Sequence, residues 1–106
     1  MRKARTLDQA RRLEDMPNVG PAIAADLRAL DVEQPCQLRG RDPVQLYVDL
    51  CTATGRRHDP CVLDTFMAVV AFAERDDARP WWSFTAGRQA AWPGVEARLP
   101  PALRKA

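Results

Sequence analysis

The chain has 106 residues, of which 46% are hydrophobic, 28% are charged and nine are prolines, and its formal net charge at pH 7 is +2. A chain of this length forms one core, which excludes a large multidomain enzyme. No stretch between charged residues reaches the roughly twenty apolar residues that a membrane-spanning helix needs, so we expect no membrane partner.

The first expected helix spans residues 6–15. Its first residue, a threonine, is a good N-cap, and Leu7, Ala10 and Leu13 recur at the three-residue spacing of one helical face. Pro17 ends this segment, because proline does not continue a helix.

The second expected helix spans residues 21–30 and follows the tight segment 17–20. Pro21 suits the first helical position, where its missing N–H costs nothing. An apolar stripe then runs along one face, formed by Ile23, Ala24, Leu27 and Leu30.

Two later helices share one start signal, an aspartate followed by a proline. Asp42 precedes a helix that runs from residue 43 to Gly55, after a short helical turn expected over residues 36–40. Asp59 precedes a second one, over residues 60–74, which is apolar around most of its circumference and therefore belongs at the centre of a bundle.

The sequence predicts an all-α fold, a compact bundle of about four to five helices, because no segment of strand length alternates with a period of two. We expect residues 1–85 to form the helical domain. Prolines and glycines after this point favour an irregular basic tail over residues 86–106.

Charge is unevenly distributed along the chain. Residues 1–12 hold five basic residues and one acidic residue, residues 79–106 hold the same numbers, and the middle holds six basic and twelve acidic residues. Any nucleic-acid binding should therefore depend on the basic ends. The N-terminal segment lacks the apolar run of a secretory signal, and three cysteines are too few for a disulfide framework, so we expect a cytoplasmic location and no cofactor.

The segment 16–30, MPNVGPAIAADLRAL, resembles the helix-hairpin-helix family. In that family the hairpin glycine lets the backbone approach a phosphate, and amides at the start of the second helix donate to its oxygens. Ala22 stands where a phosphate-pairing lysine is common, and a tight helical corner that only packs the core is the alternative. The resemblance implies a nucleic-acid site formed by Asn18, Val19, Gly20, Ala22 and Ile23, with charge from Arg5, Arg11 and Arg12.

Over residues 12–86 the chain resembles the C-terminal domain of the competence regulator TfoX, a helix-hairpin-helix relative, through PNVGP and RDPVQLY. It is more similar still to small bacterial pathogenicity-locus or mitomycin-resistance proteins, through PNVGPAIAADLR, RHDPCVLDTF and RPWWSFT. This resemblance implies a link to DNA or its damage and assigns no reaction.

Cys51, His58 and Cys61 are candidates for a thiol or metal site at the junction of two helices. A helix N-terminus lowers the pKa of a nearby thiol, and Cys61 lies at such a position. Its thiolate would then be a nucleophile, with His58 as the base beside it. A zinc ion would need a fourth ligand, Asp59 or Cys36. The alternative is that these residues cap helices and pack in the core.

Adjacent Trp81 and Trp82 cannot share one helical face, so one of them is expected to stay accessible for stacking on a base or for binding a partner. The alternative is a lid on a small core. Three functions follow as hypotheses. The first is a non-enzymatic module that binds the DNA backbone without sequence specificity, with a link to DNA damage or uptake. The second is a module that binds an unidentified protein through the hairpin or through Trp81 and Trp82, and the third is a thiol or metal site at Cys51, His58 and Cys61.

Overall fold

Four α-helices and five short 3₁₀ turns form the part of the chain that the computed structural model describes, residues 2–104, and this part contains no strand. The helices are α1 (Pro21–Ala29), α2 (Pro43–Thr54), α3 (Pro60–Arg75) and α4 (Thr85–Arg98). The 3₁₀ turns are Leu7–Gln9, Leu13–Asp15, Pro35–Leu38, Trp81–Phe84 and Pro101–Leu103. The expected all-α fold is confirmed. No helix within residues 2–104 is long and apolar enough to cross a membrane.

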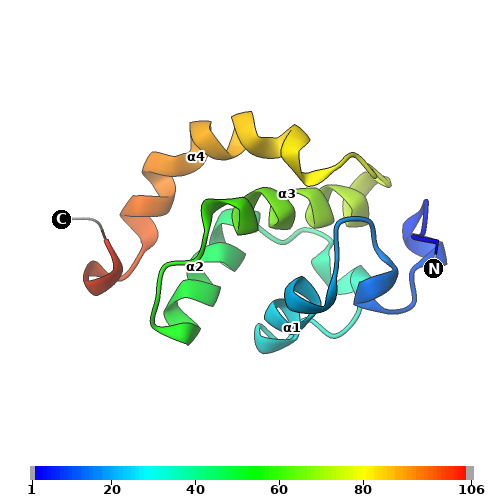
Figure 1. Ribbon diagram of the computed structural model, residues 1–106, viewed down its shortest axis with the longest axis horizontal. Coiled ribbons are helices and arrows are strands. Elements are labelled where there is room, and N and C mark those ends of the chain that lie inside the picture. Colours follow the sequence, from blue (N-terminus) through cyan, green and yellow to red (C-terminus); the bar gives the residue numbers. More distant parts are fainter. Residues whose placement is uncertain (1, 105–106) are drawn as a thin grey trace.

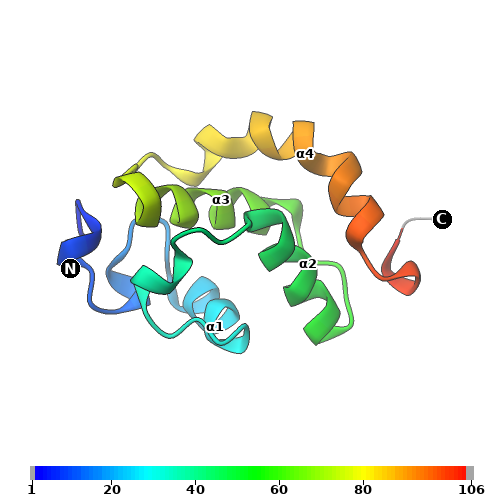
Figure 2. The same cartoon turned by 180° about the vertical axis from the view of Figure 1, so that it is seen from behind.

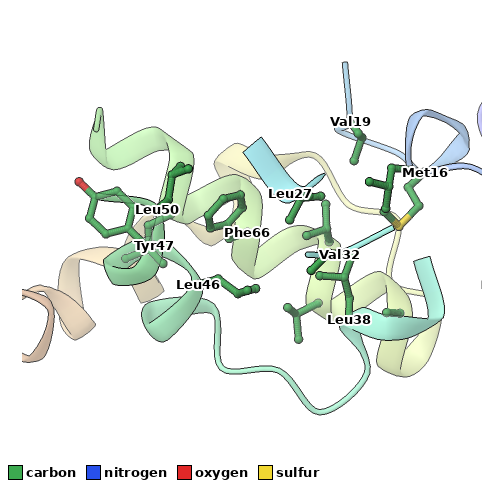
Figure 3. Packing of buried hydrophobic residues seen from close by; sticks show 14 of the residues in the cluster. Met16, Val19, Leu27, Val32, Leu38, Leu46, Tyr47, Leu50 and Phe66 are labelled. Atoms are coloured by element: carbon green, nitrogen blue, oxygen red, sulfur yellow. The ribbon is translucent and has the colours of Figure 1, made fainter. Parts of the chain in front are cut away.

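Helix α3 lies at the centre of the bundle. Figures 1 and 2 show α4 running along one side of α3, with α1 and α2 on the other side. Phe66 and Phe72 of α3 are almost fully buried. In Figure 3, Phe66 is surrounded by the side chains of Leu27, Leu46 and Leu50, so one aromatic ring joins three helices. The prediction that the most apolar helix is central is therefore confirmed.

The aspartate-proline signals mark true helix starts. The Asp42 carboxylate accepts a hydrogen bond from the Val44 N–H (2.9 Å), and the Asp59 carboxylate accepts one from the Cys61 N–H (2.8 Å). Gly55 ends α2 with a φ of 71°, the left-handed conformation in which a glycine carries no steric penalty. The expected second helix and the short helical turn near residue 36 are also present.

The prediction of a single helix over residues 6–15 is wrong. This segment forms two separate 3₁₀ turns, with Ala10 in an extended conformation between them. The Asp15 carboxylate accepts hydrogen bonds from the Arg11 and Arg12 N–H groups, at 3.0 and 2.9 Å, and this arrangement starts a new turn where a helix would have continued. The Leu7 N–H donates to the carboxylate of Asp76 (2.7 Å), the residue that ends α3, and so ties this segment to α3.

The prediction of an irregular tail from residue 86 is wrong over residues 86–98, which belong to α4. The helix contains Pro93, which cannot donate the usual intrahelical hydrogen bond. Packing outweighs that loss, because Val95 and Leu99 are fully buried and the Trp92 ring lies 5.8 Å from the Tyr47 ring. Helix α4 is therefore part of the same core as α2 and α3.

Candidate functional site

The turn between residues 15 and 21 is a tight corner held from inside. Met16 and Val19 are buried in the core, and the Val19 N–H donates to the Met16 carbonyl (3.3 Å). Asn18 adopts a left-handed φ of 70°, as its residue type allows. The side chain and the N–H of Val19 are thus both engaged within the fold, so Val19 shapes the corner.

The start of α1 lacks a side-chain cap. Gly20 is its N-cap residue, Pro21 has no N–H, and the Ala22 and Ile23 N–H groups have no acceptor among the described residues. The first turns of α2 and α3, in contrast, each donate to an aspartate. Free N–H groups at the positive end of a helix dipole attract an anion.

Gly20 leaves the approach to these donors open. Its φ of −100° is accessible to any residue, and a Cβ atom built on it would meet nothing within 4 Å. The fold therefore does not require glycine here, and the open space lies on the surface of the molecule. A side chain at this position would occupy the volume in front of the start of α1.

Lys3 lies on the corner, although the sequence pattern did not single it out from the other basic residues near the N-terminus. Its ammonium donates to the Val19 carbonyl (2.6 Å) and to the Glu14 carbonyl (2.5 Å), and the side chain is otherwise exposed. An ammonium has three donors, so one remains for a ligand. Lys3 thus places a cation at the carbonyl of Val19, the residue before the N-cap of α1. Ala22, which stands where the family commonly has a lysine, supplies no charge.

The three predicted arginines lie in the N-terminal segment that precedes the corner. Arg5, Arg11 and Arg12 are exposed, and Arg12 forms an ion pair with Asp15 (3.4 Å). Their backbone N–H groups bond to side chains of the N-terminal segment itself. They therefore add positive charge to the segment that precedes the corner.

Asn18 joins the corner to the tryptophan segment. Its side-chain amide donates to the Arg79 carbonyl (2.9 Å), and its side-chain oxygen accepts from the Trp81 N–H (2.9 Å). The side chain is thus used within the fold, in contrast to its predicted role as a ligand contact. Trp81 is half-buried, and its ring meets that of Trp82 edge-on at 5.6 Å. Trp82 is 63% exposed, so the expected asymmetry between the two tryptophans is present.

A bidentate ion pair lies beside the corner. The Arg28 guanidinium of α1 donates to both carboxylate oxygens of Glu14, at 2.7 and 2.9 Å. These hydrogen bonds lower the pKa of Glu14 to about 2. The pair balances the charge of the Glu14 carboxylate.

We expect the Glu14–Arg28 ion pair to make the stability of the protein depend on pH below about 4.5. Because the folded pKa of Glu14 is depressed, its stabilising contribution is complete above the unfolded value of about 4.5 and is lost as pH falls through about 2. Thermal melts of the wild type and Glu14→Gln should differ at pH 6, and the difference should shrink steadily below pH 4.5. A difference in Tm that does not change with pH would contradict this assignment.

The candidate thiol and metal residues do not form a reactive group. Cys51 is buried and Cys61 is exposed, and no cluster of three His, Cys, Asp or Glu side chains in residues 2–104 is placed to hold a metal ion. His58 is buried beside the Thr54 hydroxyl (2.8 Å), and burial lowers its pKa. A hydrogen bond to Asp59 raises the pKa of Cys61, which favours the alternative that these residues cap helices and pack in the core over an activated thiolate.

Comparison with known proteins places the chain among bacterial relatives. Residues 6–90 match the model of the pathogenicity locus family, Cdd1. The chain is similar to a protein called mitomycin resistance protein McrB from Streptomyces lavendulae, with 44% identity over 77 residues that span 73% of each chain. No solved structure matches it significantly.

Proposed function

The chain belongs to the pathogenicity locus family, and from this premise we propose that it is a non-enzymatic module that binds the nucleic-acid backbone without reading base sequence. In this proposal the corner and α1 act as the hairpin and second helix of a helix-hairpin-helix motif related to that of the TfoX C-terminal domain, with the 3₁₀ turn Leu13–Asp15 in place of the first helix. The similarity to a protein named for mitomycin resistance is consistent with a role linked to DNA damage.

The observation that carries the proposal is the uncapped start of α1 with a lysine beside it. The Ala22 and Ile23 N–H groups have no acceptor among residues 2–104, and the Lys3 ammonium donates a hydrogen bond to the Val19 carbonyl. Together they offer donors and charge to one phosphate, the arrangement by which helix N-termini bind anions. Backbone amides and lysine contact phosphate and carry no information about base sequence.

Trp82 extends the proposed surface. The Asn18 hydrogen bonds hold the neighbouring residue, Trp81, against the corner, and the Trp82 side chain is exposed. A base can stack on an exposed indole only where it is unpaired or at a strand end. We therefore expect a single strand to bind more tightly than a duplex of the same length.

The test is fluorescence anisotropy with labelled mixed-sequence duplex and single strand, titrated in salt. We expect dissociation constants of about 1–100 μM that rise steeply with salt. Gly20→Val should weaken binding by about tenfold or more, because its side chain occupies the space before the Ala22 and Ile23 amides. Lys3→Ala should reduce the salt dependence by about one phosphate contact.

Gly87→Val is the matched control. Gly87 lies in α4, is exposed, and has open space around its Cβ position. The substitution therefore introduces the same side chain elsewhere on the surface. It should bind like the wild type. Failure of the wild type to bind at low salt, or equal losses in both glycine variants, would refute the phosphate site.

A second candidate function is binding to a protein through the corner or through Trp81 and Trp82. The observation that favours it is the 63% exposure of Trp82, the one large hydrophobic side chain so exposed in residues 2–104. This function would be favoured over the first if the wild type binds a protein partner at high salt, Trp82→Ala does not bind it, and neither binds nucleic acid.

A further inference from the structure

A pocket of about 380 Å³ lies between the connection that precedes α3 and the outer helix α4, on residues that neither proposed function uses. Its lining consists of Arg57, His58, Pro60, Arg88, Gln89 and Trp92. This volume is within the range of small-molecule sites, and the mixture of an aromatic wall with a few polar groups is typical of them.

The two guanidinium groups of the pocket are held in place by carboxylates. Arg88 donates through Nε to Asp64 (2.8 Å), which is fully buried. Arg57 donates through Nη1 to Glu96 and to the Leu103 carbonyl (2.9 Å). Among the described residues these are the only hydrogen bonds of either guanidinium, so each keeps free N–H donors on a fixed frame.

The remaining walls are apolar or uncharged. The half-buried Trp92 ring is positioned by the Arg57 guanidinium, 5.8 Å from its centroid, and by the Tyr47 ring. Pro60 lines the pocket beside it. Burial lowers the pKa of His58, which keeps the imidazole neutral at pH 7. Among residues 2–104, no carboxylate lines the pocket.

We propose that this pocket binds a planar aromatic monocarboxylate, with the ring against Trp92 and the carboxylate on the free donors of Arg57 and Arg88. A flat ring suits the indole face, and guanidinium donors match a carboxylate. Asp64 and Glu96 already balance the charges of the two arginines, so the free N–H donors hold the ligand, which favours one negative charge on it over several.

The test uses 2-naphthoate and its neutral isostere 2-naphthamide, titrated into the full chain and followed by NMR of the tryptophan indole N–H signals. We expect 2-naphthoate to bind with a dissociation constant of about 1 mM or below and to shift the Trp92 signal. The amide should bind about tenfold more weakly, because it loses the charge-assisted hydrogen bonds.

Gln89→Glu tests the site without touching its supporting ion pairs. Gln89 is exposed at the pocket wall, and a carboxylate there should weaken 2-naphthoate binding about fivefold. Gln89→Lys should bind at least as well as the wild type. Ala90→Glu adds the same charge at the next exposed residue of α4, outside the lining, and should have little effect.

Three results would overturn the proposal: no binding, equal affinity for the acid and the amide, or a shift confined to Trp82. The last would mean that the ring adsorbs to the exposed indole and not to the pocket. Nucleic-acid binding has no bearing on these outcomes, because the pocket shares no residue with the corner at the start of α1.

Discussion

Asp64→Asn should lower the free energy of unfolding by about 3 kcal/mol, although the two side chains have almost the same shape. Asp64 is fully buried in α3 and accepts hydrogen bonds from Arg88 Nε (2.8 Å) and from the Thr85 hydroxyl (2.6 Å). The neutral amide leaves the Arg88 guanidinium, which is only 17% exposed, without its counter-charge. Denaturant titration measures the loss as a lower midpoint.

Asp59→Asn is the control for this prediction. This substitution makes the same chemical change at the exposed N-cap of α3. Asparagine caps a helix as well as aspartate does, so the stability should be almost unchanged. The double variant Asp64→Leu with Arg88→Met should recover much of the lost stability, because it removes both buried charges together. A loss for Asp64→Asn no greater than that of the control would disprove the role of the ion pair.

Asn18→Ala should destabilise the protein by about 2–3 kcal/mol. The change removes two hydrogen bonds, to Arg79 and Trp81, each worth about 1 kcal/mol. It also places a residue with a Cβ and no compensating side chain at a φ of 70°, which costs about 1 kcal/mol more. Thermal and denaturant unfolding measure the sum.

Asn18→Gly separates the two contributions. Glycine adopts the left-handed conformation freely, so this variant should lose only the hydrogen bonds, about 1–2 kcal/mol. A glycine variant as stable as the wild type would show that the bridge to the tryptophan segment contributes nothing. Changes in tryptophan fluorescence in both variants are expected, because Trp81 is held by the lost acceptor.

The features that sequence predicted well are those encoded by neighbouring residues. Asp42 and Asp59 each cap a helix whose first residue is proline, and both helices begin where these local signals place them. Gly55 ends α2 for an equally local reason. The apolar circumference of α3 indicated its central position, because such a helix has no face suited to water.

The features that sequence missed depend on distant partners. Leu7 lies on the predicted face of a helix, yet the segment forms two 3₁₀ turns and is bonded through the Leu7 N–H to Asp76, at the end of α3. Pro93 and Gly94 indicate irregular chain, yet the burial of Val95 and Leu99 keeps α4 helical through them. No spacing rule connects such pairs.

The same holds for the candidate site. PNVG indicated a corner, and the corner is present with Asn18 in the left-handed conformation. The partners of Asn18 are more than sixty residues away, and the contact of Lys3 with Val19 depends on how the N-terminal segment folds back. Asp64 and Trp92 also escaped notice, because a single aspartate in an apolar helix and a tryptophan beside a proline carry no motif.

The bridges from Leu7 and Asn18 to residues 76–81 also set an order in time. Each joins positions 61 to 69 residues apart, whereas α2 and α3 are adjacent along the chain and are built from local hydrogen bonds. Helices form within about a microsecond, and distant contacts close later. We therefore expect the hydrogen bonds that join the corner at residues 16–20 to residues 79 and 81 to form only after α3 and the tryptophan segment have emerged from the ribosome.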